Sequence, residues 1–459
     1  MKIEFVTHAS FIVEHAGVRM ICDPWLEGTA FNDGWALLSP PVLPYSAFAD
    51  IDYIWFSHEH PDHFSPPTLK KIAPEHRARI TVIYQATDDH KVASYCRNQG
   101  FKDVIELAPG RTFQLGGGLE IVIGTWPGYS DSWARVSTPT TVLLNLNDCA
   151  VTSPEHVEAI RDQVGPVDVL FTQFSISAWD GNVEERDRRH RGARTMLERV
   201  SMQCDVLRPT HVVPFASYIW FCHHENFYMN EAFLPISEVA SVLTERCVAQ
   251  PVFLYPGDRW PIGAPHDSAS AVERYAADLA DLPQRSRVEP PLIAPEALIE
   301  SSRAFVDAML DGSDASRLRV HLARNNRKWL HQREGAPSVR QELSTLRSTL
   351  ALRVEPARVH VSDHGRSYLF DPFEGLVPVD LPEDRCDISV GSQSLQYSFR
   401  FLWGGDAMHI NGRFRRVSPR GRGLLFHMFS LASNRNNGQT LTWSEVAERL
   451  ARRALERVS

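Results

Sequence analysis

The chain has 459 residues, of which 43% are hydrophobic and 23% are charged, and this is the composition of an ordinary globular protein. Its formal net charge of −8 gives no electrostatic reason to expect binding to nucleic acid or to an anionic membrane surface. It contains neither a long apolar run nor a signal-peptide pattern, so we expect no membrane span and a cytoplasmic location. The cysteines are scattered and lack CxxC spacing, which predicts reduced core thiols.

Strand-like and helical segments alternate along the first half of the chain. The apolar run 51–56 predicts a buried strand. Further strands are predicted at 80–84, 119–123, 141–146, 167–171 and 211–214, and helices at 88–98, 154–163 and 183–200. A strand-rich pattern with covering helices is typical of an α/β protein built in layers.

A cluster of metal-ligating residue types follows the predicted strand 51–56 directly. The cluster contains His58, His60, Asp62 and His63, with Glu59 between the first two histidines. His58 and His60 are expected to lie on one face of the extended start of the loop, whereas Asp62 and His63 are turned toward a second position. The loop could therefore bind two metals. Imidazole and carboxylate together suit zinc, iron or manganese. The HxHxDH pattern is far more specific than a single HxH pair.

These six residues resemble the metal-binding loop of the metallo-β-lactamase fold superfamily. Segments 7–14 and 21–26 look like the opening hairpin of that fold. The segments that flank the metal loop, and two that follow it, are similar in order to the catalytic region of CMP-N-acetylneuraminate hydroxylases: 23–35, 67–71, 145–149 and 214–218. The resemblance covers roughly residues 1–262. It implies an α/β fold, the αββα sandwich, with metals at one edge between two sheets.

Three further ligands are expected from distant positions. Asp148 matches the family's Asp-Cys step, and a carboxylate there would bridge two metals. His223 falls at the family's histidine position; His224 is the alternative, and neighbouring residues point differently, so at most one of them should coordinate. The superfamily's zinc hydrolases usually have histidine in a Pro-Gly-His step, where this chain has Tyr129. We therefore expect Asp131 as the remaining ligand, with Tyr129 as the alternative.

A carboxylate in place of an imidazole makes the first site harder, which favours iron over zinc. Diiron hydroxylases of antibiotic biosynthesis with this fold show the same kind of departure. The resemblance implies a non-haem diiron monooxygenase that uses O2 to hydroxylate a C–H bond of a small molecule of specialised metabolism. One iron is expected at His58, His60, Asp131 and Asp148, and the other at Asp62, His63, Asp148 and His223. The alternative is a dizinc hydrolase of a lactone, phosphodiester or sulfate ester.

We also expect a particular electron donor and particular roles for three other residues. The related hydroxylases carry a Rieske domain, whose cluster needs a CxH and a CxxH step. The sequence has one CxH step, at 222–224, and no CxxH step, so we expect a separate ferredoxin or flavoprotein reductase. Glu59 is interpreted as a base beside the metals or as a solvated residue, Tyr129 as a catalytic candidate, and His8 as a partner of the ligands or a packed core histidine.

The second half of the chain is expected to form another domain, since the length exceeds that of a usual single core. Prolines cluster at 263–294, which is the composition of a boundary, so we expect domains at 1–262 and 295–459. Helices are predicted at 295–310, 341–352 and 444–457, strands at 358–361, 386–390 and 397–401, and a hairpin at 404–414. This α+β arrangement is loosely similar to a sterol-carrier-like module. A lid, a substrate-binding domain or a homodimer contact fits it equally.

Overall fold

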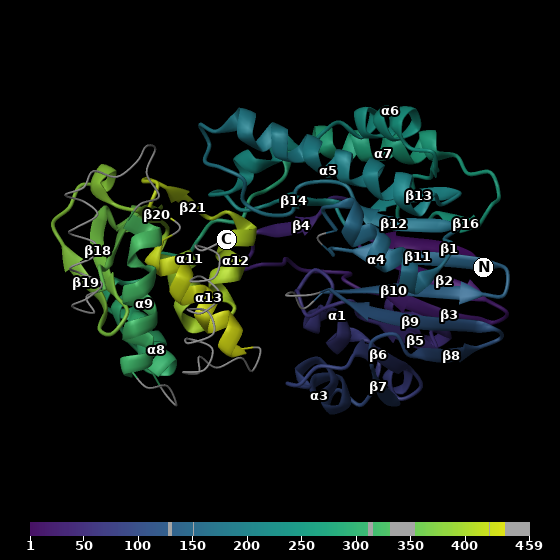
Figure 1. Cartoon of the computed structure of the whole chain (residues 1–459), viewed down its shortest axis with the longest axis horizontal. Coiled ribbons are helices and arrows are strands. Elements are labelled where there is room, and N and C mark those ends of the chain that lie inside the picture. Colours follow the sequence, from purple (N-terminus) through teal and green to yellow (C-terminus); the bar gives the residue numbers. More distant parts are fainter. Residues whose placement is uncertain (127–130, 150, 311–314, 331–353, 422, 437–459) are drawn as a thin grey trace, which may run out of the picture. The chain divides into compact units, whose positions relative to one another are not determined.

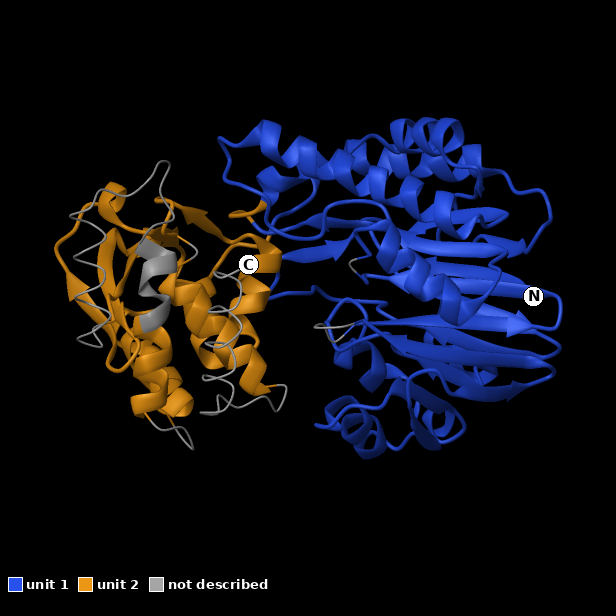
Figure 2. Ribbon diagram, viewed as in Figure 1, with its two compact units in different colours: residues 1–223, 227–287 blue, residues 224–226, 288–459 orange. Residues whose placement is uncertain are grey.

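The computed structural model describes residues 1–126, 131–149, 151–310, 315–330, 354–421 and 423–436. The chain divides into two compact units (Figure 2). Unit 1 contains Met1–His223 and Phe227–Arg287, and unit 2 contains His224–Asn226 and the chain from Val288 onward. Within the described ranges, every helix falls short of the length or the hydrophobicity that a bilayer span requires.

Unit 1 is built on two seven-stranded sheets (Figure 1). In spatial order the first sheet contains β16 (Arg259–Pro261), β1 (Lys2–Thr7), β2 (Ser10–His15), β3 (Val18–Cys22), β5 (Tyr53–Trp55), β6 (Thr81–Gln85) and β7 (Asp103–Leu107). The second contains β15 (Gln250–Pro251), β13 (His211–Phe215), β12 (Val169–Gln173), β11 (Thr141–Asn147), β10 (Ser132–Thr138), β9 (Leu119–Thr125) and β8 (Thr112–Gly116). A separate pair joins β4 (Trp35–Leu37) to β14 (Ile219–Phe221).

The two sheets of unit 1 pack face to face through aromatic side chains. Phe11 of β2 stacks on Phe171 of β12 with ring centroids 4.4 Å apart, and its edge meets Phe215 of β13. All three rings are fully or almost fully buried. This contact between the inner faces forms the centre of a sandwich core.

Helices cover the outer faces of both sheets (Figure 1). On the first sheet lie α1 (Pro66–Lys71), α2 (Pro74–Arg77) and α3 (Lys91–Asn98); on the second lie α4 (Pro154–Val164), α5 (Arg186–Leu207), α6 (Ile236–Arg246) and α7 (Ser268–Asp281). Leu69 of α1 and Val92 of α3 share one buried cluster with Ile54 of β5, and α5 contacts β12. The order helix, sheet, sheet, helix is the αββα sandwich expected from the sequence, and that prediction is confirmed.

The segment 263–294, expected to be a linker, contains a packed helix. Tyr275 of α7 is fully buried, and its ring stacks on that of Tyr218 with centroids 3.9 Å apart. Its hydroxyl donates a hydrogen bond of 2.8 Å to the carbonyl of Leu254. These contacts place α7 inside unit 1, which runs to Arg287. The prolines of this segment therefore lie around a helix rather than along an extended linker.

Unit 2 combines one sheet with several helices, as expected for an α+β domain. The sheet contains β19 (Gly375–Val379), β18 (Arg366–Asp371), β17 (Ala357–Val361), β20 (Ile388–Val390) and β21 (Phe414–Arg416). The helices are α8 (Pro295–Leu310), α9 (Ala315–Leu330), α11 (Ser392–Arg400), α12 (Gly404–Asn411) and α13 (Leu424–Asn436). Phe305 of α8 contacts Phe370, Phe399 and Phe429, so these rings form the centre of the unit.

Two sequence predictions in unit 2 are wrong. The predicted strand 397–401 lies mostly within helix α11, and most of the predicted hairpin 404–414 is helix α12. A Cβ added at Gly405 would overlap Phe429 of α13, so the glycine permits close packing of two helices rather than a turn. Gly412, with a φ of +66°, ends α12. The predicted helices 341–352 and 444–457 lie outside the described residues.

The fold generates one stability prediction, at Gly124. This residue of β9 pairs with Trp133 of β10, and an added Cβ would overlap the Trp133 ring. Gly124→Ala should lower the free energy of unfolding by about 1–3 kcal/mol, the usual cost of overpacking. Urea denaturation measures this change. Thr125→Ala, on the exposed next residue, is the control and should change stability by less than about 0.5 kcal/mol. Equal stability of the two variants would contradict the packing described.

Candidate metal centre

The predicted metal loop lies where strands of both sheets end. His58–His63 follows β5, and Ser65 then caps α1 by accepting a hydrogen bond from the Thr68 amide. Asp148 follows β11, and Asp131 precedes β10. The Ser132 hydroxyl donates a 2.5 Å hydrogen bond to the carbonyl of Ser57. This bond ties the start of β10 in the second sheet to the metal loop of the first.

Three groups of possible metal ligands are found among the described residues. They are His58 with His60 and Asp131, His58 with His63 and Asp148, and His8 with Asp62 and His63. Within each group, one donor atom from every residue lies within 4.8 Å of the others. The structure therefore brings together six of the predicted ligands and adds His8.

The remaining predicted site residues are placed differently. His223 is buried, and Glu59 is partly buried, but neither is a member of the three groups found in the described ranges. The side chain of His224 is exposed, with its Nδ1 3.7 Å from the carboxylate of Glu289. Tyr129 lies outside the described residues.

The geometry of the first group suits a shared cation. His58 Nε2 lies 2.9 Å from His60 Nδ1 and 4.0 Å from Asp131 Oδ1. Two donors bound to one ion at about 2.1 Å each lie about 3–4 Å apart. His58 Nδ1 is 2.9 Å from the Ser57 hydroxyl. This contact leaves Nε2 as the atom that can bind a metal ion.

The second and third groups share His63, and they contain buried donor atoms that make no hydrogen bond to the described residues. His63 Nε2 lies 3.3 Å from Asp62 Oδ2 and 3.4 Å from Asp148 Oδ2. In the part of the chain that the structure describes, neither His63 Nε2 nor Asp62 Oδ1 has a hydrogen-bond partner, although both atoms are buried. A buried polar atom without a partner is costly, and an ion is one explanation for it. These residues therefore fit a bound cation.

Asp23 orients His63, a role for which the sequence analysis offered no expectation. Asp23 Oδ2 lies 2.9 Å from His63 Nδ1, which turns Nε2 toward the other carboxylates. The carboxylate of Asp23 also accepts hydrogen bonds from the amide and hydroxyl of Ser57, at 2.8 and 2.7 Å, and from Asn147 Nδ2 at 3.0 Å. An aspartate at the end of an apolar strand was the one signal in the sequence. Its partners come from distant segments.

The ligands perturb one another's protonation. Burial raises the pKa of Asp131 to about 6, although His60 opposes this shift. Burial lowers the pKa of His58 well below its usual value, and the neighbouring His63 adds to the effect. Burial would raise the pKa of Asp62, but His63 and His8 hold it well below its ordinary range. A neutral imidazole beside ionised carboxylates is the form that binds a metal ion.

Comparisons relate part of this chain to known proteins. Residues 2–125 match the family model of the beta-lactamase superfamily domain. The chain is 24% identical over 227 residues to a protein of Mycolicibacterium smegmatis named as a Rieske 2Fe-2S iron-sulfur protein, covering 47% of this chain and 43% of that protein. It is 27% identical over 252 residues to cytidine monophosphate-N-acetylneuraminic acid hydroxylase of Danio rerio, covering 50% and 40%. These matches thus span less than half the length of either relative.

Among solved structures, the chain is similar to CmlA, a diiron beta-hydroxylase from Streptomyces venezuelae. The sequence identity is 20%, the match covers 56% of this chain and 53% of that one, and the TM-score is 0.39. The family match, the two-sheet sandwich and the histidine–aspartate groups agree with the resemblance expected from the sequence. Residues 2–125 thus match the beta-lactamase superfamily domain, and a sialic-acid hydroxylase is among the proteins to which the chain is similar.

Proposed function

We propose that this protein is a non-haem diiron monooxygenase that hydroxylates a C–H bond of a small molecule. The observation that carries the proposal is the donor set, which combines three histidines with three carboxylates: His58, His60, His63, Asp62, Asp131 and Asp148. Carboxylate oxygens are harder ligands than imidazole nitrogens, and a set rich in them favours iron or manganese over zinc. The similarity to a hydroxylase supports the same reaction class.

We assign one ion to His58, His60, Asp131 and Asp148, and the other to Asp62, His63, Asp148 and His223. Asp148 is proposed as the bridge because its carboxylate groups with both His58 and His63. The place of His223 in this set rests on the sequence resemblance. Tyr129 stays the alternative to Asp131, and Glu59, in the loop between two ligands, is proposed as a base beside the metals.

Bound iron would supply the redox chemistry with O2, so that one oxygen atom enters the substrate and the other leaves as water. The chain's own residues hold the ligands and limit the access of water. Phe31 approaches His60 edge-on with ring centroids 5.6 Å apart, and Trp25 approaches His8 at 5.8 Å. Both aromatic rings are buried. We propose that the electron pair comes from a separate ferredoxin or flavoprotein.

The first prediction of this proposal concerns metal content. Full-length protein produced in iron-replete cells should hold about two irons per chain, as a two-metal site requires. Elemental analysis of the purified protein measures this ratio, and O2 uptake with a chemical reductant checks that the iron is redox-active. Two tightly bound zincs, with no O2 uptake after iron reconstitution, would instead support the dizinc hydrolase.

The second prediction concerns the bridge. Asp148→Ala should reduce the iron content from about two per chain to about one or less and abolish O2 uptake, because one carboxylate serves both ions. Asp162→Ala is the matched control, since the Asp162 side chain is 74% exposed, and it should keep both irons. Full iron content and activity in Asp148→Ala would show that the bridge is misassigned.

The third prediction concerns Asp23. Asp23→Asn replaces an acceptor oxygen by an amide NH2, which cannot accept from Ser57 and His63 as the carboxylate does. Metal affinity should fall by about 10–100-fold, the usual effect of losing a partner behind a ligand. Competition with a chelator measures the affinity. Asp52→Asn is the control, because Asp52 is exposed and accepts from the Arg19 amide at the opposite end of β5. Equal affinities in both variants would contradict the role of Asp23.

A further inference from the structure

His8 occupies a constrained position between the two sheets of unit 1. It lies in the turn between β1 and β2, is buried, and has a φ of +34°. Its carbonyl accepts a 2.9 Å hydrogen bond from the amide of Ala216, which follows β13. A left-handed backbone at a residue other than glycine is uncommon and persists where the surrounding structure enforces it. The packing of the sandwich therefore fixes the backbone of His8 and the direction of its Cα–Cβ bond.

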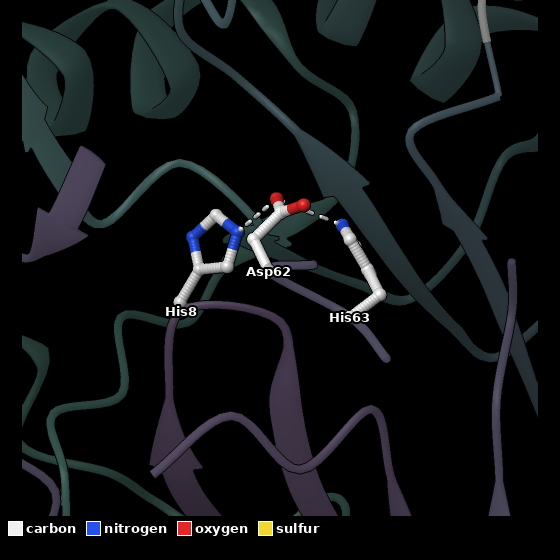
Figure 3. A group of neighbouring side chains, drawn as sticks. All are labelled: His8, Asp62 and His63. Carbon is white, nitrogen blue, oxygen red and sulfur yellow. Dashed lines mark hydrogen bonds and ion pairs between the residues drawn. The ribbon is translucent and has the colours of Figure 1, made fainter. Parts of the chain in front are cut away.

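The His8 ring makes one polar contact among the described residues, and that contact is with a candidate metal ligand. Its Nε2 lies 3.2 Å from Asp62 Oδ2. Figure 3 shows this contact together with the neighbouring His63. The Nδ1 atom of His8 is buried without a hydrogen-bond partner in the described ranges. Trp25 and His63 meet the ring edge-on, with centroids 5.8 and 5.7 Å away. The surroundings thus direct the ring at Asp62.

The chemistry of this contact defines the proton's position. An ionised carboxylate only accepts hydrogen bonds, so His8 Nε2 must carry the proton. A ring nitrogen that carries a proton has no lone pair for a metal ion. Asp62 is itself 1% exposed, and its other oxygen has no partner among the residues described. His8 is therefore placed to hold one edge of this buried carboxylate and leave the remainder for an ion.

We propose that His8 is a positioning residue of the metal centre. It donates its Nε2–H to Asp62 and fixes the orientation in which that carboxylate binds the second ion. Ligating carboxylates in metal sites are commonly held in this way, and the partner contributes to metal affinity without touching the metal. This inference rests on the assignment of Asp62 as a ligand in the proposed function. It does not depend on the reaction that the ions perform.

The test uses zinc titration of full-length, metal-free protein against a competing chelator, so no O2 chemistry is needed. In His8→Ala the affinity for one of the two zinc ions should fall about 10–100-fold, with the other little affected. His8→Gln places an amide NH2 near the position of Nε2 and should recover most of the lost affinity. His15→Ala is the control, since His15 ends β2 at the far end of the same hairpin, and it should bind zinc like wild type.

Nitrogen-15 NMR of the histidines in zinc-loaded wild-type protein gives a second readout that needs no variant to fold. The proposal expects His8 Nε2 to be protonated and unligated. A zinc-bound Nε2, or equal loss of zinc in His8→Ala and His8→Gln, would overturn it in favour of direct coordination. Unchanged affinity in His8→Ala would reduce His8 to core packing. Absence of hydroxylation together with the expected His8 effect would refute the reaction while supporting this assignment.

Discussion

The buried carboxylate of Asp23 determines the geometry on which the candidate metal centre depends. A carboxylate that is 0% exposed is tolerated only when hydrogen bonds replace its hydration, and Asp23 receives them from Ser57, His63 and Asn147. These partners follow β5, lie in the metal loop and end β11, so one charge joins the ends of strands in both sheets. The same bonds direct His63 Nε2 toward Asp62 and Asp148. The hydrogen bonds of Asp23 that join these strand ends thus also orient a candidate metal ligand.

Backbone strain and unpaired polar atoms gather at the same edge of the sandwich. The left-handed, non-glycine residues include His8, Asp23, Asn147 and Ala216, and all four lie at strand ends around the centre. Such conformations cost free energy and are kept where the fold needs them for a site. His63 Nε2, which is buried and makes no hydrogen bond in the described structure, adds a second cost. A bound cation would offset that cost, which links metal binding to the stability of the sandwich.

The sequence predicts the parts of this centre that are local. The ligands of the HxHxDH loop follow one predicted strand without interruption, and Asp148 lies just after the apolar run 141–146, which was also predicted as a strand. Asp131 precedes β10, for which no strand was predicted. The role of Asp23 was not predictable because its partner Asn147 lies 124 residues away. In unit 2, the segment 404–414 was predicted as a hairpin, but Gly405 lies in helix α12, where the lack of a Cβ permits close packing against Phe429. Glycine marks both a turn and a close approach, and only tertiary contacts distinguish the two.

We propose that this edge of the sandwich holds two iron ions between histidine and aspartate side chains. Anomalous X-ray scattering from crystals of iron-loaded protein, recorded at the iron absorption edge, tests it most directly. The account predicts two peaks about 3.5–4 Å apart, one beside His58, His60 and Asp131 and the other beside Asp62 and His63, with Asp148 between them. A single peak, or peaks away from these side chains, would contradict it.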